Sequence, residues 1–316
     1  MKVVTGNRAS QILYNWLLDN NMDTKVLIAA NICETVPCTY LKAGLKIEFS
    51  DINLSTYNMD REKIVKFVKK NPNAIVHYSH TYGKRDNDIN VFFENIKSDS
   101  NCKIVDDCCL CIPQFNFCDS SCIDLQLYST GHVKPVDIGY GGFAYVNDKW
   151  KYENSTYKYS IDDFNHFSND IKVCQQKLKR PNELTINYNW LDPKIKFNNK
   201  DYFDKIKEQY QKVLIHKQNI NKIYSKIPGS MANEFNNWRY NIMVKNQSEC
   251  IDALFNENLF CSKHYVSLCN GYFSKSKTEN CDYLYSHVVN LFNDFYYTDE
   301  QALKTANILK SVAIPV

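Results

Sequence analysis

The first 150 residues alternate short apolar segments with longer amphipathic ones, and this alternation restricts the possible fold more than any other feature. The predicted strands are Lys2–Thr5, Lys25–Ala30, Lys46–Ile52, Ala74–Ser79, Lys103–Asp107, Ile123–Tyr128 and Gly142–Asn147. Apolar residues recur at helical spacing over Ala9–Asp19, Thr35–Ala43, Asp60–Lys69 and Asp88–Ser98. Strands that alternate with helices form a mostly parallel sheet between two helical layers, so we predict the α/β class with a seven-stranded-type sheet.

After residue 150 the sequence changes character, because Asn, Lys and Tyr become frequent and the apolar segments become sparse. Long helices are predicted over Ile161–Lys179, Tyr202–Lys226 and Asp299–Ser311, with short strands over Arg239–Val244 and Ser262–Ser267. Residues 180–199 are polar and are expected to be irregular. We therefore predict a large domain over residues 1–155 and a smaller α+β domain over residues 156–316.

Composition excludes several classes of protein. The net charge of the 316 residues is only +3, and the charges are interspersed, which argues against a nucleic-acid-binding surface. No apolar stretch approaches the roughly 18 residues of a transmembrane helix, and the first residues lack the apolar region of a signal peptide. The expected location is the cytoplasm.

Thirteen cysteines raise the question of a metal site. Five lie within seventeen residues: Cys102, Cys108, Cys109, Cys111 and Cys118. Because Cys108 to Cys111 are predicted to continue a buried strand, their side chains would alternate between faces and not converge on one ion. Free thiols that pack as small apolar groups are the preferred interpretation, and no metal site is predicted.

Polar side chains follow three of the predicted strands at the point where each strand ends. Asp107 ends one strand, Ser129 follows another, and Gly6-Asn7-Arg8 leads from the first strand into a helix. In open α/β sheets ligands bind at the carboxyl ends of the strands, so these residues are expected to surround one site. Lys134, in the glycine-rich loop after Ser129, belongs to the same region.

These residue types match the needs of pyridoxal phosphate (PLP). A helix N-terminus and the Ser129 hydroxyl suit a phosphate. Asp107 beside a pyridine nitrogen would keep that nitrogen protonated, which turns the ring into an electron sink. Lys134 could hold the cofactor as a Schiff base and carry a proton between substrate and cofactor. Each feature alone is also found in plain turns and caps, and only the set predicts PLP.

The same residues resemble the sugar-nucleotide aminotransferase family, the DegT/StrS group of PLP enzymes with the aspartate aminotransferase fold. The resemblance covers most of the chain and is strongest over residues 1–148. Its motifs are Gly6-Asn7-Arg8-Ala9, His80-Thr81-Tyr82-Gly83, Val105-Asp106-Asp107, the Ser129…Lys134-Pro135…Gly141-Gly142 loop, Trp238-Arg239-Tyr240 and Ser262-Lys263-His264-Tyr265. The lysine loop is the most specific of these.

The resemblance implies a role for each motif. Lys134 and Asp107 would be catalytic, and the cofactor would contact Gly6, Asn7, Arg8, Cys33, Asp107, Leu110, Ser129 and Lys134. His80, Tyr82, His264 and Tyr265 would approach the substrate. The chain departs from the family pattern at Cys33, where an aromatic residue is common, and at Leu110, where Gln or His is common. It also reaches the first glycine turn at residue 6, a few dozen residues earlier than usual.

The implied function is a PLP-dependent aminotransferase. It would move an amino group from an amino acid such as glutamate to a keto-sugar nucleotide for surface-glycan (polysaccharide) biosynthesis, and it would act as a homodimer on small molecules. Two alternatives stay open. The acceptor could be a small non-nucleotide ketone, or the chain could be a catalytically silent scaffold relative, for which Cys33 and Leu110 are the only support.

Overall fold

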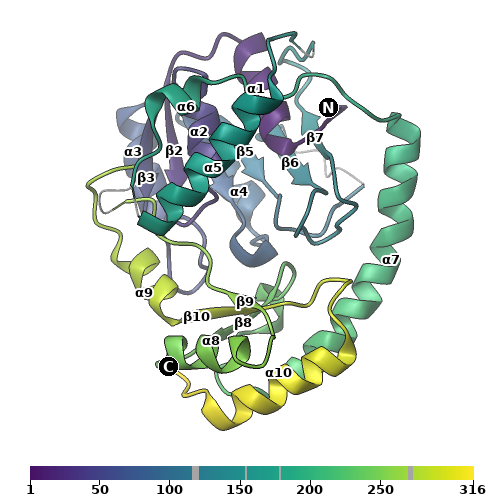
Figure 1. Cartoon of the computed structure of the whole chain (residues 1–316). Helices are drawn as coiled ribbons and strands as arrows, with labels where there is room; N and C mark the ends of the chain where they lie inside the picture. Colours follow the sequence, from purple (N-terminus) through teal and green to yellow (C-terminus); the bar gives the residue numbers. More distant parts are fainter. Residues whose placement is uncertain (116–120, 154, 178, 270–272) are drawn as a thin grey trace.

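The computed structural model describes residues 1–115, 121–153, 155–177, 179–269 and 273–316. A seven-stranded sheet has the order β1-β7-β6-β5-β4-β2-β3, and a three-stranded antiparallel sheet has the order β8-β10-β9. The large-sheet strands are β1 (Lys2–Gly6), β2 (Lys25–Ala29), β3 (Lys46–Ser50), β4 (Ile75–Ser79), β5 (Lys103–Asp107), β6 (Leu125–Ser129) and β7 (Gly142–Val146). In Figure 1 the large sheet and its helices form the upper part of the molecule, and the small sheet lies in the lower part.

Four helices cover the two faces of the large sheet: α1 (Ala9–Asp19), α2 (Thr35–Lys42), α3 (Arg61–Lys70) and α4 (Ile89–Ser98). Along β2, Val26 and Ile28 pack with residues of α1 and α2, whereas Leu27 and Ala29 pack with residues of α3 and α4. Alternate residues of a strand point to opposite faces, so burial on both sides explains the continuous apolar runs. The predicted α/β class with a seven-stranded sheet is confirmed.

The sheet is parallel except at one strand. Strands β3, β2, β4, β5 and β6 pair in parallel, and β7 runs antiparallel to both β6 and β1. The twelve residues 130–141 join β6 directly to β7 without a crossover helix, and a connection of this kind returns the chain antiparallel. The loop that contains Lys134 therefore stands on the carboxyl edge of β6.

The register aligns the predicted site residues on that edge. Gly142 pairs with Gly6 on one side and with Ser129 on the other. On the neighbouring strands, Asp107 pairs with Leu127 and with Ser79. The ends of β1, β6 and β5 thus meet at one edge, as the sequence predicted, and the end of β4 lies beside them.

Gly142 is required for the close approach of this edge to helix α1. A Cβ at position 142 would lie 2.7 Å from the backbone nitrogen of Ala9 and 2.9 Å from the carbonyl oxygen of Tyr128. Both atoms belong to the backbone, so a side chain could be accommodated only if α1 and β6 separated.

We expect Gly142→Ala to lower the free energy of unfolding by about 1–3 kcal/mol, the usual cost of overpacking a tight contact. Urea denaturation measures this change. Gly131→Ala is the matched control, since the nearest atom to its Cβ is Ser129 Oγ at 3.9 Å. Equal stability of the two variants would show that the close contact is not required.

The smaller sheet lies below the large one in Figure 1 and has its own core. It consists of β8 (Tyr240–Met243), β9 (Cys261–Ser262) and β10 (Val288–Leu291), with helices α8 (Gln247–Phe255), α9 (Glu279–His287) and α10 (Asp299–Val312). The 26-residue helix α7 (Asn199–Tyr224) runs along one side of the molecule and packs on α10. None of the helices in the described part of the chain is both long and apolar enough to cross a membrane.

Helices α5 (Ile161–Lys177) and α6 (Glu183–Asn187) follow the large sheet in sequence and lie against it in space. They pack on each other, and α6 packs on α2. Helices α5 and α6 therefore pack with the helices of the large sheet, although they fall on the far side of the predicted boundary at residues 155 and 156. The division into 1–155 and 156–316 stays a prediction.

Several predicted elements differ in extent from the observed ones. The strand predicted over Ser262–Ser267 is confined to Cys261–Ser262, and residues 180–199 contain the short helix α6. Strand β10 and helices α8 and α9 were not predicted. Strand β5 ends at Asp107, so Cys108 to Cys111 lie beyond the strand instead of continuing it. Two short 3-10 turns contact each other between the two sheets: η1 (Thr81–Gly83) follows β4, and η2 (Asn233–Phe235) precedes β8.

Candidate functional site

A cavity of about 960 Å³ opens at the carboxyl edge of the large sheet. Lys134, Asp107 and Ser129 all line it, and so do Asn7 and Arg8 at the start of α1. Strand ends far apart in sequence thus contribute to one space. The cavity brings together the amine, the carboxylate, the hydroxyl and the helix N-terminus that the sequence predicted.

Asp107 is held as a carboxylate by the residues around it. His77 Nε2 lies 3.0 Å from Asp107 Oδ2, and the Cys109 backbone N–H donates to Asp107 Oδ1 at 2.9 Å. The other ring nitrogen of His77 lies 2.9 Å from the Tyr40 hydroxyl. Burial by itself would raise the pKa of Asp107, but the contact with His77 outweighs it and lowers the pKa to about 2. The group therefore carries a full negative charge at neutral pH.

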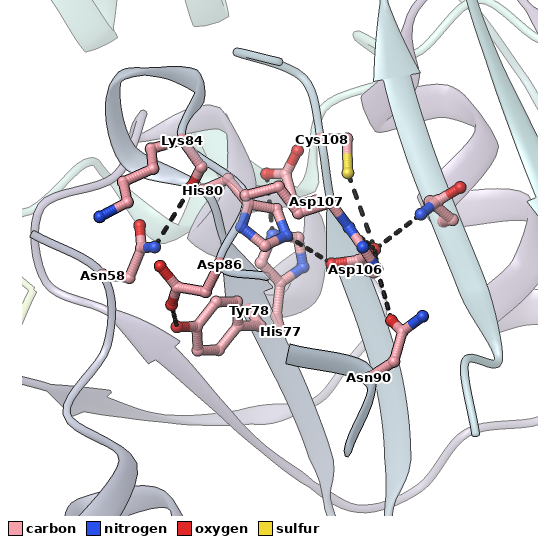
Figure 2. Close-up of polar contacts among 12 residues, drawn as sticks. Asn58, His77, Tyr78, His80, Lys84, Asp86, Asn90, Asp106, Asp107 and Cys108 are labelled. Carbon is pink, nitrogen blue, oxygen red and sulfur yellow. Dashed lines mark hydrogen bonds and ion pairs between the residues drawn. The ribbon is translucent and has the colours of Figure 1, made fainter. Parts of the chain in front are cut away.

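Asp106, the preceding residue, points to the opposite face of the sheet, because neighbouring residues of a strand alternate. Its carboxylate lies 2.6 Å from His80 Nε2 and accepts from Arg85 at 3.3 Å and from Gln126 Nε2 at 2.7 Å. Figure 2 shows the two carboxylates engaged with different partners. Asp106 is the centre of a buried ion-pair cluster, whereas Asp107 faces the cavity.

The donor atoms of His80, Asp106 and Cys108 lie within 4.8 Å of one another, a spacing that a metal ion could bridge. Arg85 argues against a cation there, because its guanidinium already places a positive charge 3.3 Å from the same carboxylate. Apart from Cys122, the cysteines of the described residues carry free thiols, and Cys118 lies outside these residues. The cluster is consistent with the sequence-based preference for structural thiols.

The ion-pair cluster predicts a pH-dependent stability. Burial lowers the pKa of His80, but Asp106 and Cys108 more than reverse this and raise it to about 10. A histidine with a raised folded-state pKa stabilises fully below its unfolded value of about 6.5, and the stabilisation disappears as the pH rises through 10. The pKa of Asp106 is lowered, so its contribution is lost only in acid.

We therefore expect wild type to exceed His80→Asn in unfolding free energy most between about pH 4 and 6.5. Above that range the difference should shrink by up to about 1.4 kcal/mol per pH unit. Urea denaturation of both proteins at a series of pH values measures it. Comparing the two proteins is necessary because burial lowers the pKa of Lys217 to about 7, which gives wild type an opposing slope. A difference independent of pH would contradict the ion pair.

The Lys134 loop is braced from within by Asp137. The Val133 N–H donates to Asp137 Oδ2 at 2.8 Å, and the Gly139 N–H donates to Asp137 Oδ1 at 2.7 Å. Among the described residues, no carboxylate pairs with Lys134, whose positive charge acts on the thiols of Cys33 and Cys109. An amine without a counterion inside a cavity is available for a ligand.

Ser129 and the start of α1 form the second end of the cavity. Ser129 lines the cavity at the end of β6, beside the loop glycine Gly131. The Arg8 guanidinium lies 4.6 Å from the Phe164 ring centre, and burial lowers its pKa. The Asn7 side chain instead bonds to the backbone before α7: it donates to the Lys194 carbonyl oxygen and accepts from the Lys196 N–H. An anion placed here would meet a hydroxyl, a guanidinium and a helix N-terminus.

Two of the predicted cofactor contacts have unusual chemistry, as the sequence already indicated. Cys33 and Leu110 both line the cavity. Burial raises the pKa of the Cys33 thiol, so the group stays neutral. Gly6 lines no part of the cavity but permits the turn, since a Cβ there would lie 2.7 Å from Ile12.

The four predicted substrate residues occupy different places. Tyr265 lines the cavity, and His80 is found at its edge with the imidazole turned into the Asp106 cluster. Tyr82 is fully buried and donates its hydroxyl hydrogen to the His264 carbonyl oxygen at 2.8 Å. Burial lowers the pKa of His264 to about 4. Tyr82 and His264 are not among the residues that line the cavity, whereas His80 and Tyr265 are, and the substrate contacts of all four stay predictions.

Sequence reasoning did not identify the residues that close the cavity from the opposite side. They come from the covering segment, the described residues from Tyr159, just before α5, to Lys205 in α7, and are aromatic or charged: Tyr159, Phe164, Trp190, Phe197, Lys196 and Lys205. His77 was also missed as the partner of Asp107. It lies two residues before Ser79, the end of β4, and therefore on the same face of the sheet as Ser79 and its pairing partner Asp107. That periodicity was the one available signal.

Neither a protein-family model nor a curated protein matches the sequence significantly. Solved structures do match in fold. A DegT/DnrJ/EryC1/StrS aminotransferase from Brucella abortus has a TM-score of 0.68 at 14% identity, covering 99% of this chain and 86% of its own. PseC of Helicobacter pylori, an aminotransferase of pseudoaminic acid biosynthesis, has a TM-score of 0.68 at 11% identity, covering 98% and 86%.

A third match is an enzyme with a different reaction. The GDP-4-keto-6-deoxy-D-mannose-3-dehydratase of E. coli, solved with bound hydrated PLP, has a TM-score of 0.66 at 13% identity, covering 98% of this chain and 88% of its own. At such identities the likeness concerns the fold and not the reaction. The chain has the fold of the DegT/StrS-type sugar aminotransferases and of this PLP-binding sugar dehydratase.

Proposed function

We propose that this chain is a PLP-dependent aminotransferase that transfers an amino group from an amino acid, with glutamate as donor, to a keto-sugar nucleotide. One observation carries the proposal: Lys134 and the charged carboxylate of Asp107 line the same cavity, with Ser129 and the start of α1 beside them. The solved structures of the same fold include PLP-bound and sugar-modifying enzymes, which supports the assignment.

The residues present fit PLP in their chemistry. Ser129, Arg8 and the α1 N-terminus supply hydrogen-bond donors and positive charge for a phosphate. Asp107, supported by His77, supplies the negative charge that a protonated pyridine nitrogen requires. Lys134 supplies a primary amine that no acidic group of the described chain neutralises. When bound, PLP supplies the electron sink for removal of a proton next to the substrate nitrogen.

In this mechanism each protein group has one task. Asp107 keeps its negative charge because His77 donates to it, and this charge would hold a proton on the pyridine nitrogen of a bound cofactor. With the cofactor bound, the Lys134 amine would be the group that takes and returns a proton as general base and acid. The aromatic residues of the covering segment exclude water from this exchange.

The far side of the cavity supports an anionic acceptor. Lys205 contributes positive charge there, Lys196 is paired with the lining carboxylate of Asp192 at 2.7 Å, and Trp190 and Phe197 contribute aromatic surface. A nucleotide-linked sugar carries both a diphosphate and a base that can stack, so it matches this lining in charge and in shape. A volume of about 960 Å³ is at the upper end of ligand pockets and holds more than the cofactor.

The remaining parts of the proposal concern setting. We propose a homodimer that works in the cytoplasm on a step of surface-glycan synthesis. Free thiols at the described cysteines other than Cys122 agree with a reducing compartment. Sedimentation of the purified protein tests the dimer.

The function is tested by product analysis. Purified protein loaded with PLP is incubated with ¹⁵N-labelled glutamate and a panel of nucleotide-linked keto-sugars, and the products are identified by mass spectrometry. We expect label in one sugar nucleotide. A deoxygenated, unlabelled product would instead indicate a dehydratase, and label only in a small ketone would indicate a different acceptor class. Failure to bind PLP in a folded protein would leave the scaffold alternative.

A further inference from the structure

Val133, the residue immediately before Lys134, has an unusual backbone conformation. Its φ is +62°, in the left-handed region that a β-branched residue rarely adopts. Such a conformation persists only where surrounding contacts hold it. The direction of the Lys134 backbone depends on Val133, so whatever holds Val133 also sets the position of the amine.

Both polar groups of the Val133 backbone are bonded. Its N–H donates to Asp137 within the loop, at 2.8 Å. Its carbonyl oxygen accepts from the indole Nε1–H of Trp238, also at short distance, 2.7 Å. Trp238 comes immediately before Arg239 and β8, more than one hundred residues away, on the side of the small sheet. The second brace of the lysine loop therefore belongs to the other part of the molecule.

Trp238 is itself firmly placed. Its side chain is buried and stacks on the ring of Tyr265, with ring centres 5.8 Å apart and planes inclined by 10°. The backbone carbonyl oxygen of Trp238 accepts from the buried Lys217 Nζ at 2.9 Å. Its backbone N–H donates to the Tyr82 carbonyl oxygen at 3.4 Å. The indole thus joins the lysine loop on one edge to Tyr265, a lining residue, on its face.

We propose that Trp238 is a positioning residue for Lys134. The indole N–H fixes the Val133 carbonyl and with it the left-handed turn that directs the lysine into the cavity. The same ring supports Tyr265, so one small-sheet residue sets the amine and the facing wall together. This inference rests on the proposed function for the role of Lys134, but the brace itself is a property of the chain without cofactor.

The test deletes only the donor. Trp238→Phe removes the N–H and keeps an aromatic ring against Tyr265, and benzothienylalanine at position 238 replaces the N–H by sulfur at nearly constant volume. Trp150→Phe is the matched control, since Trp150 Nε1 donates to Asp124 Oδ1 at 2.8 Å at the opposite edge of the sheet. Hydrogen exchange of the apo proteins is followed by mass spectrometry in peptides that cover residues 131–138.

We expect exchange in residues 131–138 to become on the order of tenfold faster in both position-238 variants, as loss of one hydrogen bond worth about 1.4 kcal/mol implies. Trp150→Phe should leave these peptides unchanged. The benzothienylalanine protein should melt within about 2–6 °C of wild type, which separates local release from general loss of stability. Unchanged exchange in that variant would overturn the proposal.

A second readout concerns the amine. PLP is added, borohydride fixes it covalently, and the rate of attachment to Lys134 is compared among the folded variants. We expect slower attachment in the position-238 variants and the wild-type rate in Trp150→Phe. If wild type itself does not attach PLP, the proposed function fails while the exchange result still decides the role of Trp238. Equal attachment rates with faster exchange would show that the brace does not position Lys134 and would also overturn the inference.

Discussion

Lys134→Ala is expected to abolish transamination, with a loss on the order of 10⁴-fold in kcat, because it removes both the covalent anchor of the cofactor and the proton carrier. The cavity lining includes Lys196 and Lys205 as well, but both lie on the covering side with the aromatic residues. Labelled-glutamate turnover measures the loss, and borohydride fixation followed by peptide mapping should attach PLP to Lys134 in wild type alone.

Two further variants separate chemistry from charge. Lys134→Arg keeps the positive charge but cannot release a proton near neutral pH, so it should be as inactive as Lys134→Ala. Lys25→Ala removes an exposed lysine, paired with Glu48, at the start of β2 and thus at the opposite edge of the sheet. It should keep wild-type turnover. Transamination by Lys134→Ala at even a tenth of the wild-type rate would exclude the assignment.

Asp107→Asn is expected to reduce kcat by about 10²-fold while changing stability little. The amide keeps an oxygen that can accept from His77 but lacks the negative charge that holds a pyridinium proton. Asp106→Asn should instead change kcat little and lower stability strongly. It leaves the buried His80 and the partly exposed Arg85 without a counter-charge, which costs about 3–5 kcal/mol of unfolding free energy.

The two aspartates are adjacent in sequence and both buried, and the substitution is the same, so each variant is the control for the other. Turnover is measured per folded molecule at a temperature where both variants are folded, and urea denaturation gives the stability. If Asp107→Asn keeps full turnover, or if the two variants lose turnover alike, the separation between cavity and ion-pair cluster is wrong.

The large sheet was predictable because its signals are local. The strand over Lys103–Asp107 and the helix over Ala9–Asp19 have the observed bounds, since apolar periodicity and burial on both faces leave few alternatives. The smaller sheet was harder. Strand β10 has four buried residues that follow α9 without a break, and nothing in so short a run distinguishes strand from helix.

The site divides in the same way. Asp107, Ser129 and Lys134 could be found from the sequence because strand ends in a parallel sheet meet at one edge. His80 and Tyr82 belong to a strand-end motif too, but their side chains turned to Asp106 and to the His264 carbonyl oxygen, pairings that depend on distant segments.

By itself, the sequence determined the order of strands and helices in the large sheet and the residues at its carboxyl edge, because these follow from periodicity along the chain. The tertiary structure alone decided which of two neighbouring aspartates faces the cavity with a histidine behind it, and that Trp238 holds the loop before Lys134. Contacts of this kind join residues thirty to more than one hundred positions apart. Their formation depends on packing in three dimensions, which no local pattern in the chain encodes.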